Sequence, residues 1–181
     1  MQDRLSAVVS PESTPEERAR QAAELLQSAY RLQSMGLVHE AVAMFQRSIE
    51  TSPTAEAHTY LGRAYQIQGR FEEAIEECKT AIGIDPDFGN SHNDLGAYLV
   101  DQGEFAAAIP RLERALGCER YATPHFAWFN LGRAYLGLGE LILARACQRE
   151  ALKLAPDYTL AREAIRGVQS LIQARNRAVL A

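Results

Sequence analysis

The sequence is poor in several features that mark particular classes of protein. Its 181 residues include only three cysteines, Cys78, Cys118 and Cys147, and no two have the spacing of a metal site or a redox motif. No apolar run approaches the roughly 18 residues that span a bilayer. The net charge of -4, without any local Lys/Arg cluster, argues against nucleic acid as a partner. We therefore expect cysteines that are packed or are inert surface thiols, no metal, no membrane span and no bound nucleic acid.

The first residues lack both the long apolar stretch of a secretory signal and a lipid-acceptor cysteine. We therefore expect a cytoplasmic protein, unless an export signal has been removed from the chain.

Motifs for catalysis are missing as well. His39-Glu40 begins like the zinc-binding H-E-x-x-H pattern, but the second histidine is absent. Gly137-Leu-Gly139 is not followed by the Lys-Ser/Thr of a phosphate-binding loop. The glutamates within residues 72–77 form a run that is typical of a solvated helix face. We predict that the protein is not an enzyme and holds no cofactor.

What the sequence does contain is a fourfold internal repeat. A column of glycines recurs at spacings of 33, 34 and 36 residues, and two columns of small residues share these spacings. The columns are Gly36, Gly69, Gly103 and Gly139; Ala41, Ala74, Ala108 and Ala144; and Ala29, Gly62, Gly96 and Gly132. A period near 34 predicts a solenoid of paired helices.

Each column has a mechanical explanation. In the first glycine column, Gly69, Gly103 and Gly139 end one helix, where a left-handed residue is needed, and the small columns let two helices pack closely. Pro53, Pro86 and Pro156 end the second helix of a unit. His58 and His92 occupy one column of adjacent units, so we expect half-buried packing residues, with a metal pair between stacked helices as the alternative.

The pattern resembles the tetratricopeptide repeat. The residues that carry the resemblance follow in order as Trp128, Leu131, Gly132, Tyr135, Ala144, Ala151 and Pro156. The resemblance implies an all-α fold, a right-handed superhelical α-solenoid of helix-turn-helix repeats whose first helices line a concave groove. We place the four repeats at 22–54, 55–88, 89–122 and 125–158.

The two ends complete this arrangement. Thr14-Pro15-Glu16-Glu17 has the pattern of a capping box and predicts a helix that begins at Pro15, after a disordered segment at 1–14. An apolar stripe after the last repeat predicts a capping helix over 159–178, which would complete a domain at 15–181. The same stripe would also suit a dimer seam, although we favour a monomer.

The third repeat departs from the pattern twice. Pro110 lies inside its second helix, near the start, and predicts a slight bend. At its end Arg120 replaces the expected proline, two residues are added, and Thr123-Pro124 opens the next helix. The segment at 120–132, R-Y-A-T-P-H-F-A-W-F-N-L-G, is similar to the corresponding segment of type IV pilus pilotin and assembly proteins.

The resemblance also implies which side chains face a partner in the groove. We select as partner-binding residues Tyr30, Arg63, Asn93, Phe126, Phe129, Asn130 and Arg133. Phe126 and Phe129 lie three residues apart with Arg133 one turn beyond, which is the composition of a binding hot spot. In the alternative, Tyr121 and the inserted loop fold over Phe126 and leave no binding site.

We predict a non-catalytic scaffold that binds a protein or peptide in the groove of four repeats. The alternatives are a pilus or secretion-system assembly factor, suggested by the segment at 120–132, and a secretion chaperone. Chaperones of the last class are similarly small, acidic repeat proteins.

Overall fold

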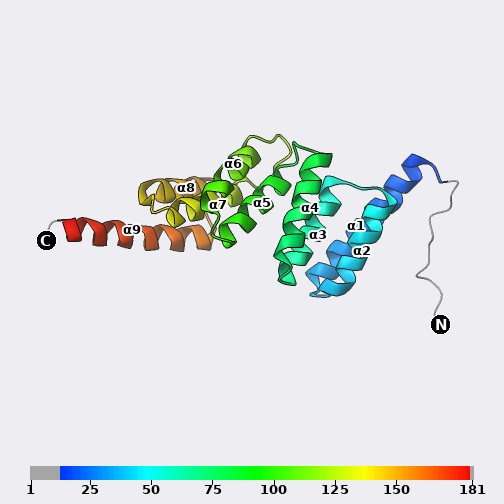
Figure 1. Cartoon of the computed structure of the whole chain (residues 1–181), viewed down its shortest axis with the longest axis horizontal. Helices are drawn as coiled ribbons and strands as arrows, with labels where there is room; N and C mark the ends of the chain where they lie inside the picture. The colour runs from blue at the N-terminus through cyan, green and yellow to red at the C-terminus, as the bar shows by residue number, and fades with distance from the viewer. Residues whose placement is uncertain (1–12, 180–181) are drawn as a thin grey trace. The chain divides into compact units, whose positions relative to one another are not determined.

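The structure is a computed structural model that describes residues 13–179. Every regular element in this range is a helix, which confirms the all-α prediction (Figure 1). The nine helices within residues 13–179 are α1 (Pro15–Ser34), α2 (Val38–Thr51), α3 (Ala55–Ile67), α4 (Phe71–Ile84), α5 (Gly89–Asp101), α6 (Phe105–Leu116), α7 (Pro124–Gly137), α8 (Leu141–Leu154) and α9 (Thr159–Val179). None of the helices described is both long and apolar enough to cross a bilayer.

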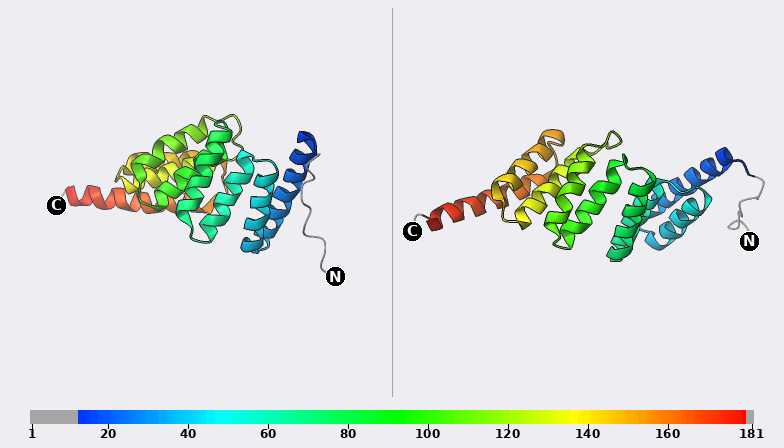
Figure 2. Two further views of the ribbon diagram at one scale, coloured as in Figure 1. Left: turned by 45° about the vertical axis from the view of Figure 1, so that its right-hand side comes forward. Right: turned by 45° about the horizontal axis from the view of Figure 1, so that its top comes forward.

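Successive helices pack in pairs, and the views of Figures 1 and 2 agree on this pairing. The pairs are α1 with α2, α3 with α4, α5 with α6, and α7 with α8, while α9 lies against α8. Helices α1–α4 form one compact unit and α5–α9 a second, divided between Ile84 and Asp85. The grouping of all repeats into one domain over 15–181 stays a prediction.

A glycine in the left-handed region ends the first helix of each pair, as predicted for Gly69, Gly103 and Gly139. The φ angles of Gly36, Gly69, Gly103 and Gly139 lie between 77° and 81°. After α3, the Gly69 N–H donates to the Gln66 carbonyl over 3.0 Å and the Arg70 N–H donates to the Tyr65 carbonyl over 2.9 Å. These two hydrogen bonds satisfy carbonyls that the helix end would otherwise leave unpaired, and they require a positive φ at the glycine.

Small residues allow the two helices of a pair to approach closely, which also agrees with the prediction. A Cβ atom on Gly96 would lie 2.5 Å from Cγ of Leu112, and Ala108 is completely buried. Trp128 and Tyr135 pack against the apolar cluster of unit two that contains Ala108 and Leu112. A larger residue in these columns would have to push the helices apart.

The predicted cap of α1 is present. The Glu17 N–H donates to the Thr14 hydroxyl over 3.2 Å, and the Thr14 N–H donates to the Glu17 carboxylate over 2.8 Å. Except for Ser13 and Thr14, the segment predicted to be disordered lies outside the described residues. Pro110 lies inside α6, which runs on to Leu116 without a break.

The inserted loop after α6 packs against the segment that precedes α5. Arg120 forms an ion pair with Asp85, its guanidinium carbon lies 5.3 Å from the centre of the Phe88 ring, and its carbonyl accepts from the Gly89 N–H. A Cβ atom on Gly89 would lie 2.4 Å from Cβ of Tyr121. The absence of a side chain at Gly89 therefore makes room for the loop.

Candidate binding surface

The seven predicted site residues fall into two groups, one in each unit. Tyr30 and Arg63 come from α1 and α3 of unit one. The other five belong to α5 and α7, which are neighbours in unit two. The two groups are described separately.

In unit one, Tyr60 of α3 joins the two predicted residues. The rings of Tyr30 and Tyr60 meet edge to face with their centres 5.5 Å apart, and the guanidinium of Arg63 lies 5.2 Å from the Tyr60 ring centre. Phe45 lies on the inner side of Tyr60, at 6.3 Å. Because 56% of Tyr30 remains exposed, this cluster offers an aromatic surface beside a cation.

In unit two, the polar residues form one continuous chain of hydrogen bonds. The Asn130 amide donates to the Asn93 side-chain oxygen over 3.2 Å, and Arg133 donates to the Asn130 oxygen over 3.3 Å. Arg133 also donates to the Asp101 carboxylate over 2.6 Å. Asn93 and Asn130 are only 6% and 7% exposed, so their amides orient Arg133 and offer little surface to a partner.

The aromatic residues of α7 gather around Tyr158, which lies in the turn before α9. The Tyr158 ring centre is 5.1 Å from that of Phe129, 5.7 Å from that of Phe126 and 5.5 Å from that of His125, in each case close to edge on. Phe129 is half-buried by this packing, while 40% of Phe126 stays exposed. The ring that borders Phe126 and Phe129 is thus Tyr158, whereas Tyr121 packs at Gly89.

The electrostatics of this cluster follow from its partial burial. Burial raises the pKa of the Tyr158 hydroxyl, and the nearby charge of Arg133 acts in the opposite direction. Burial lowers the pKa of His125, which favours the neutral form of its imidazole. The cluster therefore presents neutral rings with the charged guanidinium of Arg133 close by.

Sequence reasoning missed Tyr158, Asp101 and Tyr60. A signal for Tyr158 was present, because Pro156-Asp157-Tyr158 repeats the pattern of Pro86-Asp87-Phe88, and each tripeptide directly precedes a helix. Phe88 is buried, and the same column therefore carries an aromatic that packs beside the next helix. No comparable pattern marked Asp101, the last residue of α5.

The histidines expected to pack are engaged within their own units. His58 Nδ1 lies 2.6 Å from a Glu77 carboxylate oxygen, and His92 Nε2 lies 3.0 Å from the Pro86 carbonyl oxygen. Burial lowers the pKa of His92. Among the described residues, no three His, Cys, Asp or Glu side chains are grouped as a metal ion would require.

The cysteines are buried thiols, as expected. Cys78, Cys118 and Cys147 are all buried, and none of them forms a disulfide. Burial raises the pKa of Cys118, and it raises that of Cys147 to about 11. Because the thiolate is the nucleophilic form, the raised pKa makes Cys118 and Cys147 weak nucleophiles at neutral pH.

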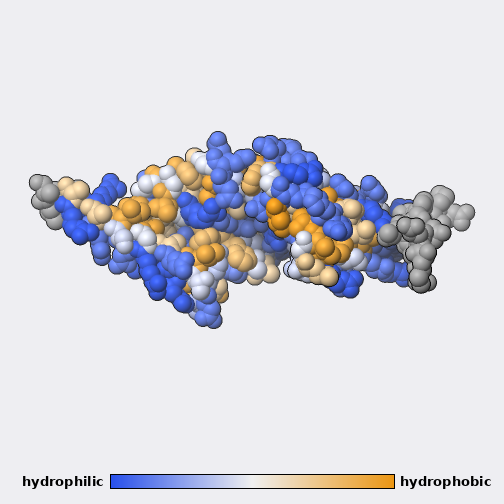
Figure 3. All heavy atoms as spheres, turned by 90° about the horizontal axis from the view of Figure 1, so that it is seen from below, coloured by the Kyte–Doolittle hydropathy of each residue, from blue (hydrophilic) through white to orange (hydrophobic). Residues whose placement is uncertain are grey.

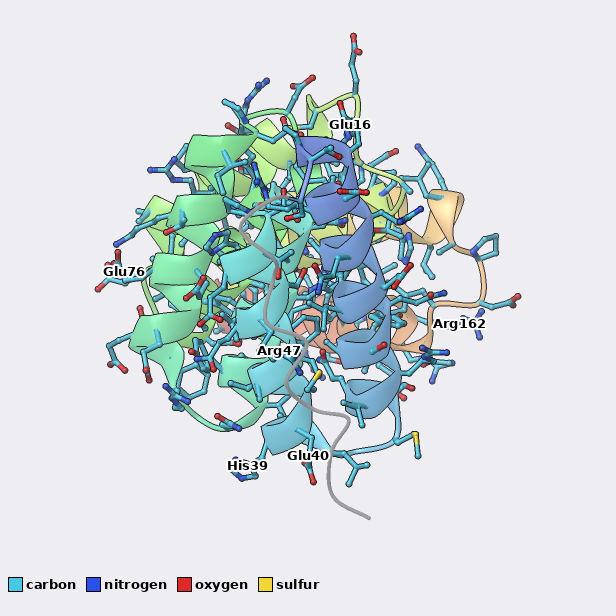
Figure 4. All side chains as sticks on the ribbon, turned by 90° about the vertical axis from the view of Figure 1, so that its right-hand side faces the viewer. Glu16, His39, Glu40, Arg47, Glu76 and Arg162 are labelled. Carbon is cyan, nitrogen blue, oxygen red and sulfur yellow. The ribbon has the colours of Figure 1, made fainter. Side chains whose placement is uncertain are left out.

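Charged side chains that were discounted as catalytic groups point away from the helices. Figure 4 shows Glu76 at the outer edge of α4, and His39 and Glu40 pointing outward at the start of α2. All three are exposed. On the face drawn in Figure 3, hydrophobic residues reach the surface in patches between hydrophilic ones.

Fold and surface together define a class: a protein built of helical hairpins, each unit of which presents aromatic side chains beside an arginine. Two segments, residues 55–88 and 125–158, match family models of the tetratricopeptide repeat. The chain therefore contains tetratricopeptide repeats, as the sequence predicted.

A curated relative supports the same conclusion. The chain is 32% identical over 136 residues to human tetratricopeptide repeat protein 7A, a match that covers 74% of this chain and 15% of that protein. The chain thus spans a small part of the length of this relative.

Two solved structures are similar in fold. PilF of Pseudomonas aeruginosa superimposes with a TM-score of 0.80 at 21% identity, covering 88% of this chain and 71% of PilF. PilW, a type IV pilus biogenesis factor, superimposes with a TM-score of 0.79 at 22% identity, covering 84% and 70%. At these identities the likeness concerns the fold alone.

Proposed function

We propose that the chain is a non-catalytic scaffold that binds a protein or peptide along the first helices of its repeats. The observation that carries this proposal is the exposed ring of Phe126 on the same helix as Arg133, two turns away, where the Arg133 guanidinium is already oriented by Asn130 and Asp101. Orientation before binding lowers the entropy that a partner must overcome. Aromatic and arginine side chains dominate the energy of many protein interfaces.

The chemistry of this surface defines the partner's contact residues. An apolar side chain of the partner covers Phe126 and the edge of Tyr158. A carboxylate of the partner accepts from Arg133, which exchanges part of its contact with Asp101 for the new one. In unit one, Tyr30 and Arg63 offer the same combination of ring and cation to a second segment of the partner.

The binding energy can be bounded from burial. Phe126 is 40% exposed, so covering this exposed part of its side chain contributes about 1 kcal/mol. A charge-assisted hydrogen bond of Arg133 contributes about 1.5 kcal/mol, at the lower end of the usual range because Asp101 competes for the guanidinium. Removing both should weaken binding by about thirtyfold to a hundredfold.

The test is the double variant Phe126→Ala, Arg133→Gln, compared with wild type in a quantitative pull-down and then in a titration of the recovered partner. A matched control is Ile142→Ala, Arg149→Gln, which removes an exposed apolar side chain and a charge from α8. We expect the control to bind like wild type. Partners retained equally by both double variants would refute the proposed surface, provided that both variants melt like wild type.

The alternative function is assembly of pili or of a secretion system. The observation that favours it is the segment at 120–132, whose inserted loop is held against Asp85 and Phe88. PilF and PilW share the fold, and PilW is described as a type IV pilus biogenesis factor. Deletion of the gene in its own host should then abolish surface pili or secretion, whereas a general scaffold leaves both intact.

A secretion chaperone is a further alternative of the same kind. It predicts that the purified protein keeps one secreted protein soluble and that both are recovered as a stable complex. For each alternative we propose a cytoplasmic monomer without cofactor. Cell fractionation and light scattering test these two properties directly.

A further inference from the structure

Helix α7 also borders a hollow that lies away from the aromatic cluster. The hollow is formed by α6, α7 and α8 and has a volume of about 700 Å³, which is within the range of ligand pockets. Trp128 and Tyr135 of α7 line it. At 100° per residue these two lie on the opposite face of α7 from Phe126 and Phe129, so the hollow is separate from the proposed binding surface.

Its walls are mainly apolar. Leu116 of α6 and Leu143 of α8 line it together with the two aromatic rings of α7. Leu143 is 46% exposed, and Leu116 and Trp128 are only half-buried. This apolar surface therefore stays open to solvent, where a partner's side chain gains energy by covering it.

The charges that line the hollow have one sign. Glu113 comes from α6 and Glu150 from α8, while no Lys or Arg is among the described residues of the lining. The charges of both glutamates add to burial in raising the pKa of the Cys147 thiol, which also lines the hollow. Glu150 has an ion pair of 2.6 Å with Lys153, but Lys153 is 70% exposed, and such surface pairs are weak.

We propose that this hollow binds an Arg or Lys side chain of a partner protein together with an apolar side chain beside it. The cation lies over the Trp128 ring between the two carboxylates, where ring and charges attract it together. The apolar neighbour covers Leu116 and Leu143. The hollow thus selects a basic segment of a partner, whereas Arg133 selects an acidic group. Binding in the hollow does not depend on the surface formed by Phe126 and Arg133.

Trp128 is the only tryptophan of the chain, so its fluorescence reports on this hollow alone. The probe is the capped peptide Leu-Arg-Leu-Arg-Leu, and the control is the same peptide with glutamate in place of arginine. We expect a saturable change of emission with the arginine peptide, an affinity that falls as salt is raised, and no saturable change with the glutamate peptide.

The variant Glu113→Gln, Glu150→Gln keeps the shape of the hollow and removes its charge. We expect its affinity for the arginine peptide to fall by roughly threefold to tenfold, the effect of losing two partly exposed ion pairs. Phe126→Ala should bind the peptide like wild type. Equal binding of both peptides, unchanged affinity in the glutamine variant, no response of Trp128, or loss of binding in Phe126→Ala would each overturn the proposal.

Discussion

Replacing Gly96 by alanine adds one carbon atom, Cβ, between α5 and α6 and so tests how closely these two helices pack. Gly96 lies in the interior of α5, and the added Cβ would stand 2.5 Å from Cγ and 2.6 Å from Cδ2 of Leu112. An ordinary contact between carbon atoms is about 3.5–4.0 Å. Leu112 is completely buried, so it has no free space into which it can withdraw.

Two effects of opposite sign decide the result. Alanine is favoured over glycine inside a helix by about 1 kcal/mol. Overpacking of a buried core costs about 1–3 kcal/mol. The expected net effect is a loss of up to about 2 kcal/mol in the free energy of unfolding.

Gly167 of α9 offers a matched control for the same substitution. It is also inside a helix of unit two, but nothing lies within 4 Å of the position that its Cβ would occupy. Gly167→Ala should therefore stabilise the protein by about 0.5–1 kcal/mol. Because both variants share the helix effect, the difference between them measures the overpacking alone, about 1–3 kcal/mol.

Urea unfolding followed by circular dichroism measures both free energies. We expect Gly96→Ala to unfold at a lower and Gly167→Ala at a higher urea concentration than wild type. If the two variants were equally stable, the close approach of α5 and α6 at Leu112 would be refuted, and with it the explanation of the small-residue column.

Three further predictions concern the ends of the chain and the core. Thr14→Ala removes the hydroxyl of the capping box and should cost about 1 kcal/mol in urea unfolding; an unchanged midpoint would contradict a contribution of this cap to stability. The pKa of Cys147 rises from 9.0 to about 11 on folding, so its contribution to stability is complete below pH 9 and is lost as pH rises towards 11. Between these pH values the unfolding free energy of wild type should fall more steeply than that of Cys147→Ala, and parallel profiles would contradict this. A chain that ends at Tyr158 loses α9, which covers α8, and should aggregate in light scattering; a soluble monomer from a dimeric parent would instead identify α9 as a dimer seam.

The helices and turns were predictable because their causes are local. A left-handed glycine or a capping box acts through backbone atoms a few residues away, and the sequence repeats these signals in the same register. The four glycines with positive φ and the start of α1 at Pro15 follow from such signals. The small columns were predictable for the same reason, since their period is that of the repeat itself.

The surroundings of the candidate site residues were not predictable in this way. Arg133 is held by Asp101, which lies 32 residues away along the chain. The whole of α8 lies between Phe129 and Tyr158 in the sequence, yet their rings are in contact. Asn93 and Asn130 were expected to face a partner, but each is occupied by the other once α5 and α7 lie side by side.

The sequence by itself thus determined which segments are helical, where each helix ends and which small residues lie between the two helices of a pair. Only the tertiary structure decided which rings cover one another, which amides are buried and where a hollow stays open between α6 and α8. The reason is physical: backbone conformation depends on neighbours within one or two turns, whereas side-chain contacts depend on how helices stack. A few ångströms of helix displacement separate a side-chain contact from an open site. The repeating residue types do not determine the positions of the helices to that precision.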